Sequence, residues 1–502
     1  MDYKEGSYGS MNQIYLPKMK SDKEVLIDYY KKYSEAKRRT VFIVVVIVTG
    51  IILVVSVSCA LGIYFGVNSK DNTPSKTADL TGPSCSDPCT LSLVESIPEN
   101  LTFAASSPSH PSTYDGIMRL MASAQQTIEI ASYYWTLNGN DIPYHDNSSW
   151  QGESILKTLI AAGRDKKVKI RIVQNKPDGK NNDTDALIKY AGAEVRTLDF
   201  NQLMNGGILH TKMWLIDRKH FYVGSANLDW RSYTQVKELG SVLFNCSCMA
   251  EDMGKLFDVY WYLGNTAKVP DTWPETFNTS INSNTSMQIQ FNGTDATTYL
   301  SSSPPPFCPG GRTIDIDAIV DVISKADKFV YVAVMDYFPT TQFSSPRKYW
   351  PVIDDALRRA AFDRGVSVKL LISYWNNTWE EMPLYLKSLN ILRYFNFGVH
   401  TNIEVRMFVV PAFTESQKKI PFARVNHNKY MVTDKTAYIG TSNWSGDYFI
   451  DTGGIGLVVN QNVTEEPGNV RLQLENIFYR DWDSKYSTNI DHFNFTQKHT
   501  EL

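Results

Sequence analysis

Two short stretches of the chain each carry a histidine and a lysine two positions apart, a combination suited to phosphate chemistry. The first pair is His210 and Lys212, in "HTKMWLID", and the second is His427 and Lys429, in "HNKYMVTD". A lysine can neutralise phosphate oxygens, and an imidazole can attack phosphorus or transfer a proton. Because residues two apart in a strand share one face, each pair is predicted to point in one direction from a short apolar strand.

A turn of small residues that ends in asparagine follows each pair. "GSAN" ends at Asn227, and "GTSN" ends at Asn443. Glycine permits a tight return of the chain, and the hydroxyl, amide and backbone groups add donors for an anion. If the two halves of the chain face each other, two histidines, two lysines and two asparagines converge on one cavity. The pattern therefore predicts a phosphodiester site.

These residue types also indicate a mechanism. One histidine would attack phosphorus and form a covalent phosphohistidine, while the other protonates the leaving alcohol and then deprotonates water. No carboxylate-rich metal box accompanies the two pairs, and two lysines would repel a divalent cation. We therefore expect a metal-independent reaction without a cofactor.

Four acidic residues near the motifs have separate expected roles. Asp217 and Asp434 each end an apolar strand, where an ion pair that braces the sheet is favoured over catalysis. Glu238, eleven residues after Asn227, could orient a histidine, or it could be a solvated helix charge. Asp451 could take the orienting part in the second half, although its spacing differs.

The elements that must position these residues form a tandem repeat. Each half has a helical pattern that runs into a buried strand, then a second helix, turn and strand, and ends with its His-x-Lys segment. Because helix and strand alternate, each half is predicted to be an α/β unit with a mostly parallel sheet, and the halves can meet about a pseudo-twofold axis. The matching segments are 122–135 with 324–338, 155–173 with 352–372, and 193–199 with 403–409.

A membrane anchor is predicted before the repeats. Residues 41–67 contain no charged side chain and are long enough to cross a bilayer. Basic residues 37–39 abut their N-terminal side, so the positive-inside rule predicts a type II protein. The expected organisation is a cytosolic tail (1–40), a transmembrane signal anchor (41–67), a luminal stalk (68–84), a first repeat (85–300) and a second repeat (301–502).

N-glycosylation acceptors support this topology, because none precedes the predicted anchor. Chance occurrence in an Asn-rich chain explains some acceptors but not their one-sided distribution. The Asn-x-Ser/Thr positions are Asn100, Asn147, Asn182, Asn245, Asn278, Asn284, Asn292, Asn376, Asn462 and Asn494.

The cysteines beyond the anchor predict disulfides in an oxidising lumen. Cys246 and Cys248 are too close to bridge each other comfortably, so we expect Cys85 and Cys89 to bridge to them and Cys308 to be left over. A zinc site built from four of these cysteines is the alternative.

The tail and the charge balance bear on location. Asp22 with Leu26 and Ile27 has the spacing of an acidic dileucine signal, and residues 8–11 fit a tyrosine-based signal, both of which direct proteins to endosomes. Beyond residue 40 the formal charge is −6, and all eight histidines lie there. Acidic pH would charge them and suit a polyanionic substrate, although ordinary surface charge explains the balance equally well.

The paired motifs resemble the HxKxxxxD motifs of the phospholipase D superfamily, and the resemblance extends over the whole predicted luminal region. More narrowly, "GSANLDWRSYTQVKELG", "NCSC", "RVNHNKYMVTDK" and "YIGTSNWSGDYF" are similar to animal phospholipase D family members three and four, the third more closely. This similarity covers roughly residues 85–490.

The resemblance implies a fold of two tandem phospholipase D-like α-β-α sandwich repeats. It also implies a disulfide-bonded type II glycoprotein that passes through the endoplasmic reticulum and Golgi to endolysosomes, where proteolysis releases the luminal part. Sorting adaptors would bind the tail. The oligomeric state is left open, with a homodimer as one form. By motif position His210 would be the nucleophile and His427 the acid/base. The phosphate-holding residues would be Lys212, Lys429, Asn227 and Asn443.

Three functions are compatible with the sequence. The resemblance implies a 5′ to 3′ exonuclease that cleaves single-stranded DNA and RNA at acidic pH and limits innate nucleic-acid sensing. The alternatives are a lipid transphosphatidylase that makes bis(monoacylglycero)phosphate and a non-catalytic endolysosomal protein, which would have broken motifs. An exonuclease predicts aromatic faces on which bases stack, and core packing is the alternative for the candidates. Those candidates are Tyr133, Tyr134, Trp135, Tyr337 and Phe338.

Overall fold

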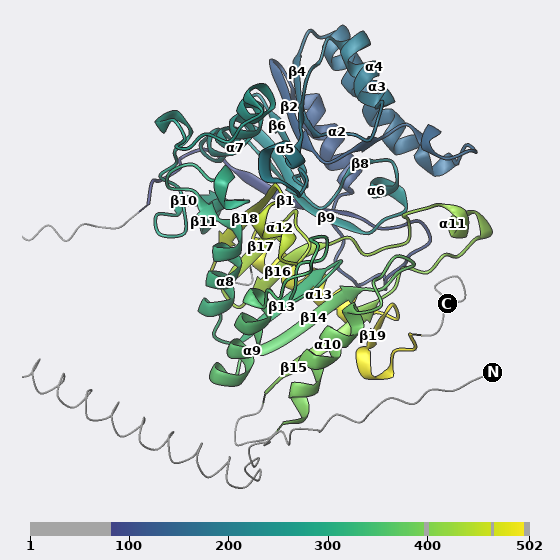
Figure 1. Cartoon of the computed structure of the whole chain (residues 1–502), viewed down its shortest axis with the longest axis vertical. Coiled ribbons are helices and arrows are strands. Elements are labelled where there is room, and N and C mark those ends of the chain that lie inside the picture. Colours follow the sequence, from purple (N-terminus) through teal and green to yellow (C-terminus); the bar gives the residue numbers. More distant parts are fainter. Residues whose placement is uncertain (1–81, 396–400, 463–465, 496–502) are drawn as a thin grey trace, which may run out of the picture. The chain divides into compact units, whose positions relative to one another are not determined.

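The computed structural model describes residues 82–395, 401–462 and 466–495, and two β-sheets dominate them (Figure 1). The first sheet has seven strands, in the order β1 (Thr90–Ser96), β9 (Glu238–Phe244), β7 (His220–Gly224), β6 (Met213–Ile216), β2 (Thr127–Ser132), β4 (Lys169–Asn175) and β5 (Glu194–Leu198). The second has ten strands, in the order β10 (Met287–Phe291), β11 (Thr294–Ser303), β18 (Gly454–Asn460), β17 (Thr436–Gly440), β16 (Lys429–Thr433), β13 (Phe329–Val334), β14 (Ser367–Ser373), β15 (Ile403–Phe408) and β19 (Ser487–Asn489), with β12 (Thr313–Ile314) beside β11.

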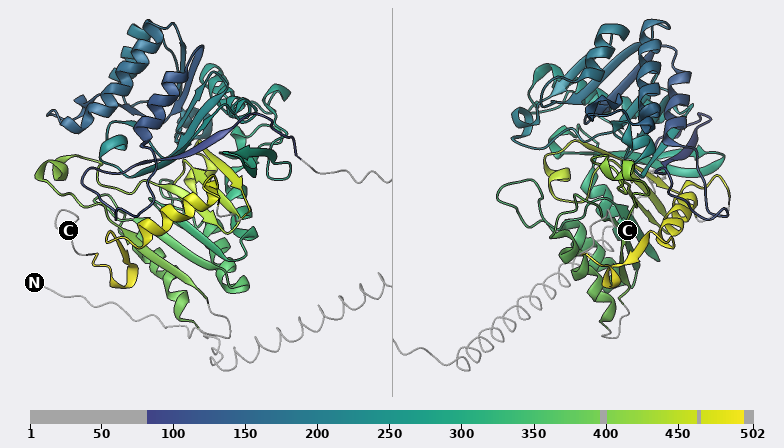
Figure 2. Two further views of the ribbon diagram at one scale, coloured as in Figure 1. Left: turned by 180° about the vertical axis from the view of Figure 1, so that it is seen from behind. Right: turned by 90° about the vertical axis from the view of Figure 1, so that its right-hand side faces the viewer.

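The two sheets share one strand order, which confirms the predicted repeat. The path β1-β9-β7-β6-β2-β4-β5 in the first sheet corresponds to β11-β18-β17-β16-β13-β14-β15 in the second. The motif strands β6 and β16 therefore occupy the same central place in their sheets. Figures 1 and 2 show the first repeat, coloured purple to teal, against the second, coloured green to yellow.

The sheets are mixed, so the expectation of mostly parallel sheets is wrong. Strands β2, β4 and β5 are parallel, as are β13, β14 and β15. The motif strands β6 and β16 are antiparallel to both of their neighbours. Only residues 217–219 separate β6 from β7, which is too short for the crossover that a parallel pair needs.

Helices cover both faces of each sheet, as an α-β-α arrangement requires. In the first repeat, Ile128 and Ile130 of β2 share one apolar cluster with Leu159 of a helix, while Ala131 shares another cluster with Phe257 of a different helix. The longer helices are α2 (Thr113–Ser123), α3 (Trp150–Arg164), α4 (Asn182–Ala191) and α7 (Ser247–Thr266) in the first repeat, and α8 (Asp315–Lys325), α9 (Val352–Arg364), α10 (Met382–Asn390) and α13 (Val470–Trp482) in the second. Short helices are α5 (Phe200–Met204), α6 (Arg231–Thr234), α11 (Glu415–Lys419) and α12 (Asp447–Ile450).

The second sheet begins earlier in the chain than residue 301, where the second repeat was expected to begin. Strands β10 and β11 form a hairpin, and β11 pairs with β18 from Thr297 to Ser303. The counterpart of β11 in the first repeat is β1, which pairs with β9 in the same antiparallel manner. The apolar alternation of residues 287–303 therefore serves the second repeat.

The predicted anchor, residues 41–67, lies outside the described residues, as do the tail 1–40 and most of the predicted stalk. Within residues 82–395, 401–462 and 466–495, no helix is long and apolar enough to cross a bilayer. The anchor thus stays a prediction from sequence.

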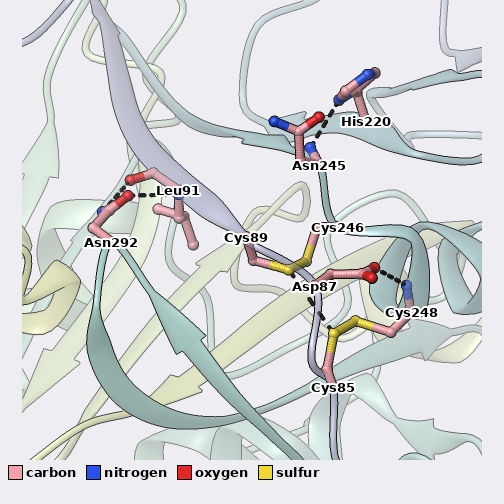
Figure 3. The surroundings of a disulfide bond; sticks show 9 residues. All are labelled: Cys85, Asp87, Cys89, Leu91, His220, Asn245, Cys246, Cys248 and Asn292. Atoms are coloured by element: carbon pink, nitrogen blue, oxygen red, sulfur yellow. Dashed lines mark hydrogen bonds between the residues drawn. A yellow bond between two sulfur atoms is a disulfide. The ribbon is translucent and has the colours of Figure 1, made fainter.

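Two adjacent disulfides connect the start of the described chain to the N-terminus of α7 (Figure 3). Cys85 bonds to Cys248 and Cys89 to Cys246, which confirms that the first pair bridges to the second. Cys308 is free. The disulfides consume the thiolates that the alternative zinc site would need.

The predicted glycosylation acceptors all lie among the described residues, and their side chains are exposed except for half-buried Asn278. The Asn292 amide nitrogen donates to the Leu91 carbonyl at 2.7 Å, next to the disulfides (Figure 3). Glycosylation at these positions stays a prediction.

Removing both disulfides should destabilise the protein by far more than twice the loss from one. A single remaining bridge still closes a loop of about 160 residues, so either double serine variant (85 with 248, or 89 with 246) should cost roughly 2 kcal/mol, and the fourfold variant roughly 7 kcal/mol. Thermal unfolding of the three variants, with Cys308→Ala as a control, measures this. The prediction would be contradicted if the variant with all four serines lost only the sum of the stabilities lost by the two double serine variants.

Candidate functional site

The two His-Lys pairs occupy equivalent places at the start of β6 and β16. In each pair the lysine Nζ donates to the backbone carbonyl of the histidine two residues earlier, at 2.7 Å, from Lys212 to His210 and from Lys429 to His427. All four side chains are buried. The lysine and histidine of each motif therefore lie on one face, as predicted from the strand period.

Two matched backbone bridges join the repeats at the histidines. The His210 N–H donates to the Gly453 carbonyl, and the His427 N–H donates to the Lys237 carbonyl, both at 2.8 Å. Bonds in the opposite direction, at 2.8 and 2.9 Å, complete each parallel bridge. Each histidine is thus held by backbone of the other repeat, in the manner expected of a pseudo-twofold axis.

The two motifs open into one cavity of about 1080 Å³. Its wall includes His210, His427, Asn227, Asn443 and Glu238, which come from both repeats. Of the two histidines, two lysines and two asparagines that were predicted to converge on one cavity, the histidines and asparagines line it, whereas Lys212 and Lys429 are buried behind its wall.

Glu238 of the first repeat contacts His427 of the second. Its carboxylate oxygens lie 2.9 and 3.1 Å from His427 Nδ1, and the Ser232 hydroxyl donates to the same carboxylate at 2.9 Å. Burial alone would raise the pKa of Glu238, but the charges of His427 and Lys429 and its hydrogen bonds outweigh burial and lower it. The contact leaves Nε2 of His427 for the cavity and stabilises the protonated ring.

His210 has no such carboxylate. The β-sheet register aligns Gly240 with Gly224 and Gly456 with Gly440, so the counterpart of Glu238 is Gly454. A Cβ at Gly454 would lie 2.3 Å from the Ser442 Oγ, which leaves no room for a side chain without movement. His210 Nδ1 is buried without a hydrogen-bond partner among the described residues.

Asp451, the other candidate for this part, accepts a 3.4 Å hydrogen bond from the Thr452 hydroxyl instead. Burial raises its pKa. The two halves are therefore equivalent in backbone but different around their histidines.

The two asparagines are held by different partners. Asn227 Nδ2 donates to the Tyr134 hydroxyl at 3.4 Å, and Asn443 Nδ2 donates to the Tyr448 hydroxyl at 3.1 Å and to Asp336 at 3.4 Å. Both amide oxygens lack a partner in the part of the chain that the structure describes. Holding a phosphate would need the amide N–H groups, which here donate to Tyr134, Tyr448 and Asp336, so the phosphate-holding role of the asparagines stays a prediction.

Comparison with known proteins identifies the family. Residues 104–413 match the family described as "PLD3/4, PLD-like domain". The chain is 52% identical over 408 residues to the "5'-3' exonuclease PLD3" of Rattus norvegicus, covering 81% of this chain and 82% of that protein. It is 46% identical over 408 residues to the "5'-3' exonuclease PLD4" of Mus musculus, covering 80% of each. The chain belongs to the PLD3/4 family of phospholipase D-like proteins.

One solved structure has a fold similar to that of this chain. The phosphatidylserine synthase of Haemophilus influenzae aligns with a TM-score of 0.50 at 12% sequence identity, over 78% of this chain and 86% of that chain. At this identity the likeness bears on fold alone, and it agrees with the two-repeat architecture.

The motif aspartates support the sheets of this fold rather than the site. Asp217 accepts backbone N–H groups of residues 125, 126 and 127 at 2.7 to 2.8 Å, and Asp434 accepts those of residues 327 and 328 at 3.0 and 3.1 Å. The predicted bracing is present, but it uses backbone donors at the start of a neighbouring strand in place of the expected ion pair. A carboxylate with two acceptor oxygens suits adjacent backbone N–H groups of one turn.

Two residues beside the asparagines were missed by sequence reasoning. Asp336 and Tyr448 both accept hydrogen bonds from the Asn443 amide. Tyr448 also packs against the His210 ring, with the ring centroids 4.9 Å apart. Asp336 follows β13 where Tyr134 follows β2, so a charged residue at the end of a buried strand was the available signal.

Buried positive charge dominates the electrostatics of the site. Burial lowers the pKa of Lys429 to about 7, although Glu238 and Asp336 oppose the shift. Burial and the charge of Lys429 place the pKa of Lys212 well below its ordinary value. Burial raises the pKa of Asp336 to about 6 and lowers that of His427 to about 4. An anion bound among these groups would favour their protonated forms.

Glu238→Gln should lower kcat/KM for a phosphodiester by about 10²- to 10⁴-fold, because a neutral amide cannot stabilise the His427 imidazolium. The amide matches the carboxylate in size, so thermal unfolding should change little. Hydrolysis of thymidine 3′-(p-nitrophenyl phosphate) measures the effect, with Asp451→Asn as the control that keeps wild-type activity. A Glu238→Gln enzyme within threefold of wild type would show that this contact is only structural.

Proposed function

We propose that this protein is a phosphodiesterase that removes nucleotides from the 5′ end of single-stranded nucleic acid through a covalent phosphohistidine. The observation that carries the proposal is the meeting of His210 and His427, from two repeats, on one cavity with Glu238 behind the second histidine. The names of relatives that are about half identical over four-fifths of the chain support the exonuclease activity.

The proposed reaction has two steps. A neutral imidazole attacks phosphorus, the bond from phosphorus to the leaving oxygen breaks, and the other histidine gives that oxygen its proton. Water then attacks the phosphohistidine, and the second histidine takes the water's proton as the first is released. Lys212, Lys429, Asn227 and Asn443 hold the non-bridging oxygens in both steps.

We assign the attack to His210 and the proton transfer to His427. A general acid must carry a proton. Burial lowers the pKa of His427 to about 4, but Glu238 opposes this shift, and the negative charge of a bound phosphate would favour the protonated form further. His210 has no carboxylate neighbour of this kind, and burial and the nearby lysines place its pKa well below the ordinary value. Its neutral form, which has the free electron pair for attack, is therefore favoured.

Purified protein covering residues 68–502 should release mononucleotides from the 5′ end of 5′-hydroxyl oligonucleotides in the presence of EDTA. His210→Ala should abolish release, and His427→Ala should slow breakdown of the phosphohistidine, so that protein carrying a labelled nucleotide accumulates on a denaturing gel. Label on the His427→Ala protein but not on His210→Ala protein is the expected outcome. The reverse pattern would exchange the two roles.

A parallel assay with lysophosphatidylglycerol tests the lipid alternative. Transfer of lipid with intact oligonucleotides would leave the phosphohistidine mechanism in place but overturn the nucleic-acid assignment. Absence of both activities in a folded protein would overturn the proposal itself.

We further propose that the protein works in endolysosomes as a type II glycoprotein. The tail signals, the one-sided acceptors and the disulfides support this location. The site supports an acidic compartment, because Lys429 is charged below its pKa of about 7. Colocalisation of the tagged full chain with a lysosomal marker, together with a mass loss on glycosidase treatment, checks both points.

The KM for single-stranded oligonucleotides should rise as the pH rises from about 5 to about 8. Lys429 loses its positive charge as the pH passes about 7, and Asp336 gains a negative charge as the pH passes about 6, so both changes weaken phosphate binding. Lys429→Arg keeps its charge over this range, so its KM should vary less with pH. Separate KM and kcat profiles measure this, and a wild-type KM that is constant over the range would contradict it.

A further inference from the structure

Large aromatic side chains remain exposed beside the catalytic cavity in the second repeat. Phe343 is 61% exposed and Trp379 is 36% exposed, and Phe343 lines the cavity together with buried Tyr448. Tyr337 and Phe338, which the sequence offered as stacking candidates, are instead buried in the core. Exposed aromatic rings at the mouth of a site indicate binding of a partly apolar ligand.

The rings form a continuous row that starts at the proposed nucleophile. The His210 and Tyr448 ring centroids are 4.9 Å apart, those of Tyr448 and Phe343 are 6.1 Å apart, and those of Phe343 and Trp379 are 6.2 Å apart. The Arg347 guanidinium lies over the Trp379 ring at 4.7 Å. Neighbouring rings meet edge to face, so they do not cover one another by stacking.

The segment that carries Phe343 is fixed although its side chain is exposed. The Asp447 carboxylate accepts the backbone N–H of Gln342, and it accepts the N–H and hydroxyl of Ser344 at 3.1 and 2.7 Å. Asp447 begins the short helix α12, which also contains Tyr448. The two rings are therefore positioned by one carboxylate, and a ligand would not have to order them.

We propose that Tyr448, Phe343 and Trp379 form a stacking track for successive bases of the single-stranded substrate, with Arg347 at its outer end. This proposal rests on the nuclease function proposed above. Aromatic faces accept any base, because every base has a π-face, and an arginine adds a cation–π contribution. The track therefore binds single strands without selecting a sequence, and a paired duplex cannot use it because its bases are already stacked.

Polar side chains of the first repeat that line the cavity favour a nucleic acid over a lipid chain. Beside aromatic residues such as Tyr133, the first repeat lines the cavity with Asn175, Lys176, Lys180 and Asn181. An acyl chain would leave these groups without polar partners, whereas the sugars and phosphates of a strand can bond to them.

The test combines protein variants with substrates that lack bases. Phe343→Ala should raise the KM for a single-stranded oligonucleotide by about 5- to 100-fold with kcat within about threefold of wild type, since stacking acts on binding. Trp379→Ala should do the same only for longer strands, because Trp379 lies further from His210. Phe362→Ala is the matched control, an exposed ring on α9 that does not line the cavity.

An oligonucleotide with abasic residues at successive positions from the 5′ end identifies the contact. When the abasic residue is at the position that contacts Phe343, the KM of the wild type should rise by the same factor as Phe343→Ala causes on an intact strand. The variant should then show no further rise in KM. Equal KM values for wild type and both variants on intact strands would overturn the track.

Binding of a labelled oligonucleotide to His210→Ala, with and without Phe343→Ala, separates failure of the track from failure of the nuclease function. Weaker binding after Phe343→Ala supports the track even if no cleavage is seen, and unchanged binding overturns it. A Phe343→Ala defect confined to lysophosphatidylglycerol transfer would assign these rings to a lipid chain and also overturn the proposal.

Discussion

The site depends on two backbone bridges that join the repeats at the histidines. The amides of His210 and His427 each donate to a carbonyl of the other repeat, so neither histidine can move without its neighbour across the seam. Beside one bridge, buried Lys237 pairs with Asp481 at 2.6 Å, and Arg480 pairs with Glu95. Breaking one member of such a buried group leaves an uncompensated charge, which costs several kcal/mol. The seam is thereby held together where the chemistry requires precise placement.

Duplication supplies this arrangement, and divergence then gives its halves different chemistry. Glu238 corresponds to Gly454, and Tyr134 corresponds to Asp336, at positions where the backbones of the repeats match. Two identical histidine environments would titrate alike, whereas attack and proton donation need opposite protonation states. A carboxylate behind one histidine alone is the smallest change that separates them, and it is available only because both repeats lie in one chain.

Much of this could be predicted from local sequence, and the remainder depends on contacts between distant segments. The strand period placed His210 with Lys212, because that period is a local property. Spacing left Glu238 open between a partner of a histidine and a solvated helix charge, since its contact with His427 spans 189 positions of the chain. Periodicity does not contain strand direction, so the antiparallel motif strands were mistaken for parallel ones. Periodicity also does not show which backbone N–H groups donate to Asp217, because these groups lie 90 or more residues away in the chain. Phe343 lies in an irregular segment whose place is fixed by Asp447, more than 100 residues later, and no local pattern reveals such a contact.

The buried lysines are the groups that make the site attractive to a phosphodiester. Burial lowers the affinity of both Lys212 and Lys429 for protons, and the charge of Lys429 lowers that of Lys212 further, so the site holds positive charge at a cost. A phosphodiester relieves that cost, and it relieves more of it in the transition state, where negative charge grows on the oxygens. The same burial makes the attraction depend on pH, because a lysine with a pKa of about 7 can lose its proton near neutrality. The expected phosphate binding and its expected dependence on pH therefore share one physical origin, which is the burial of two cations where water screens them little.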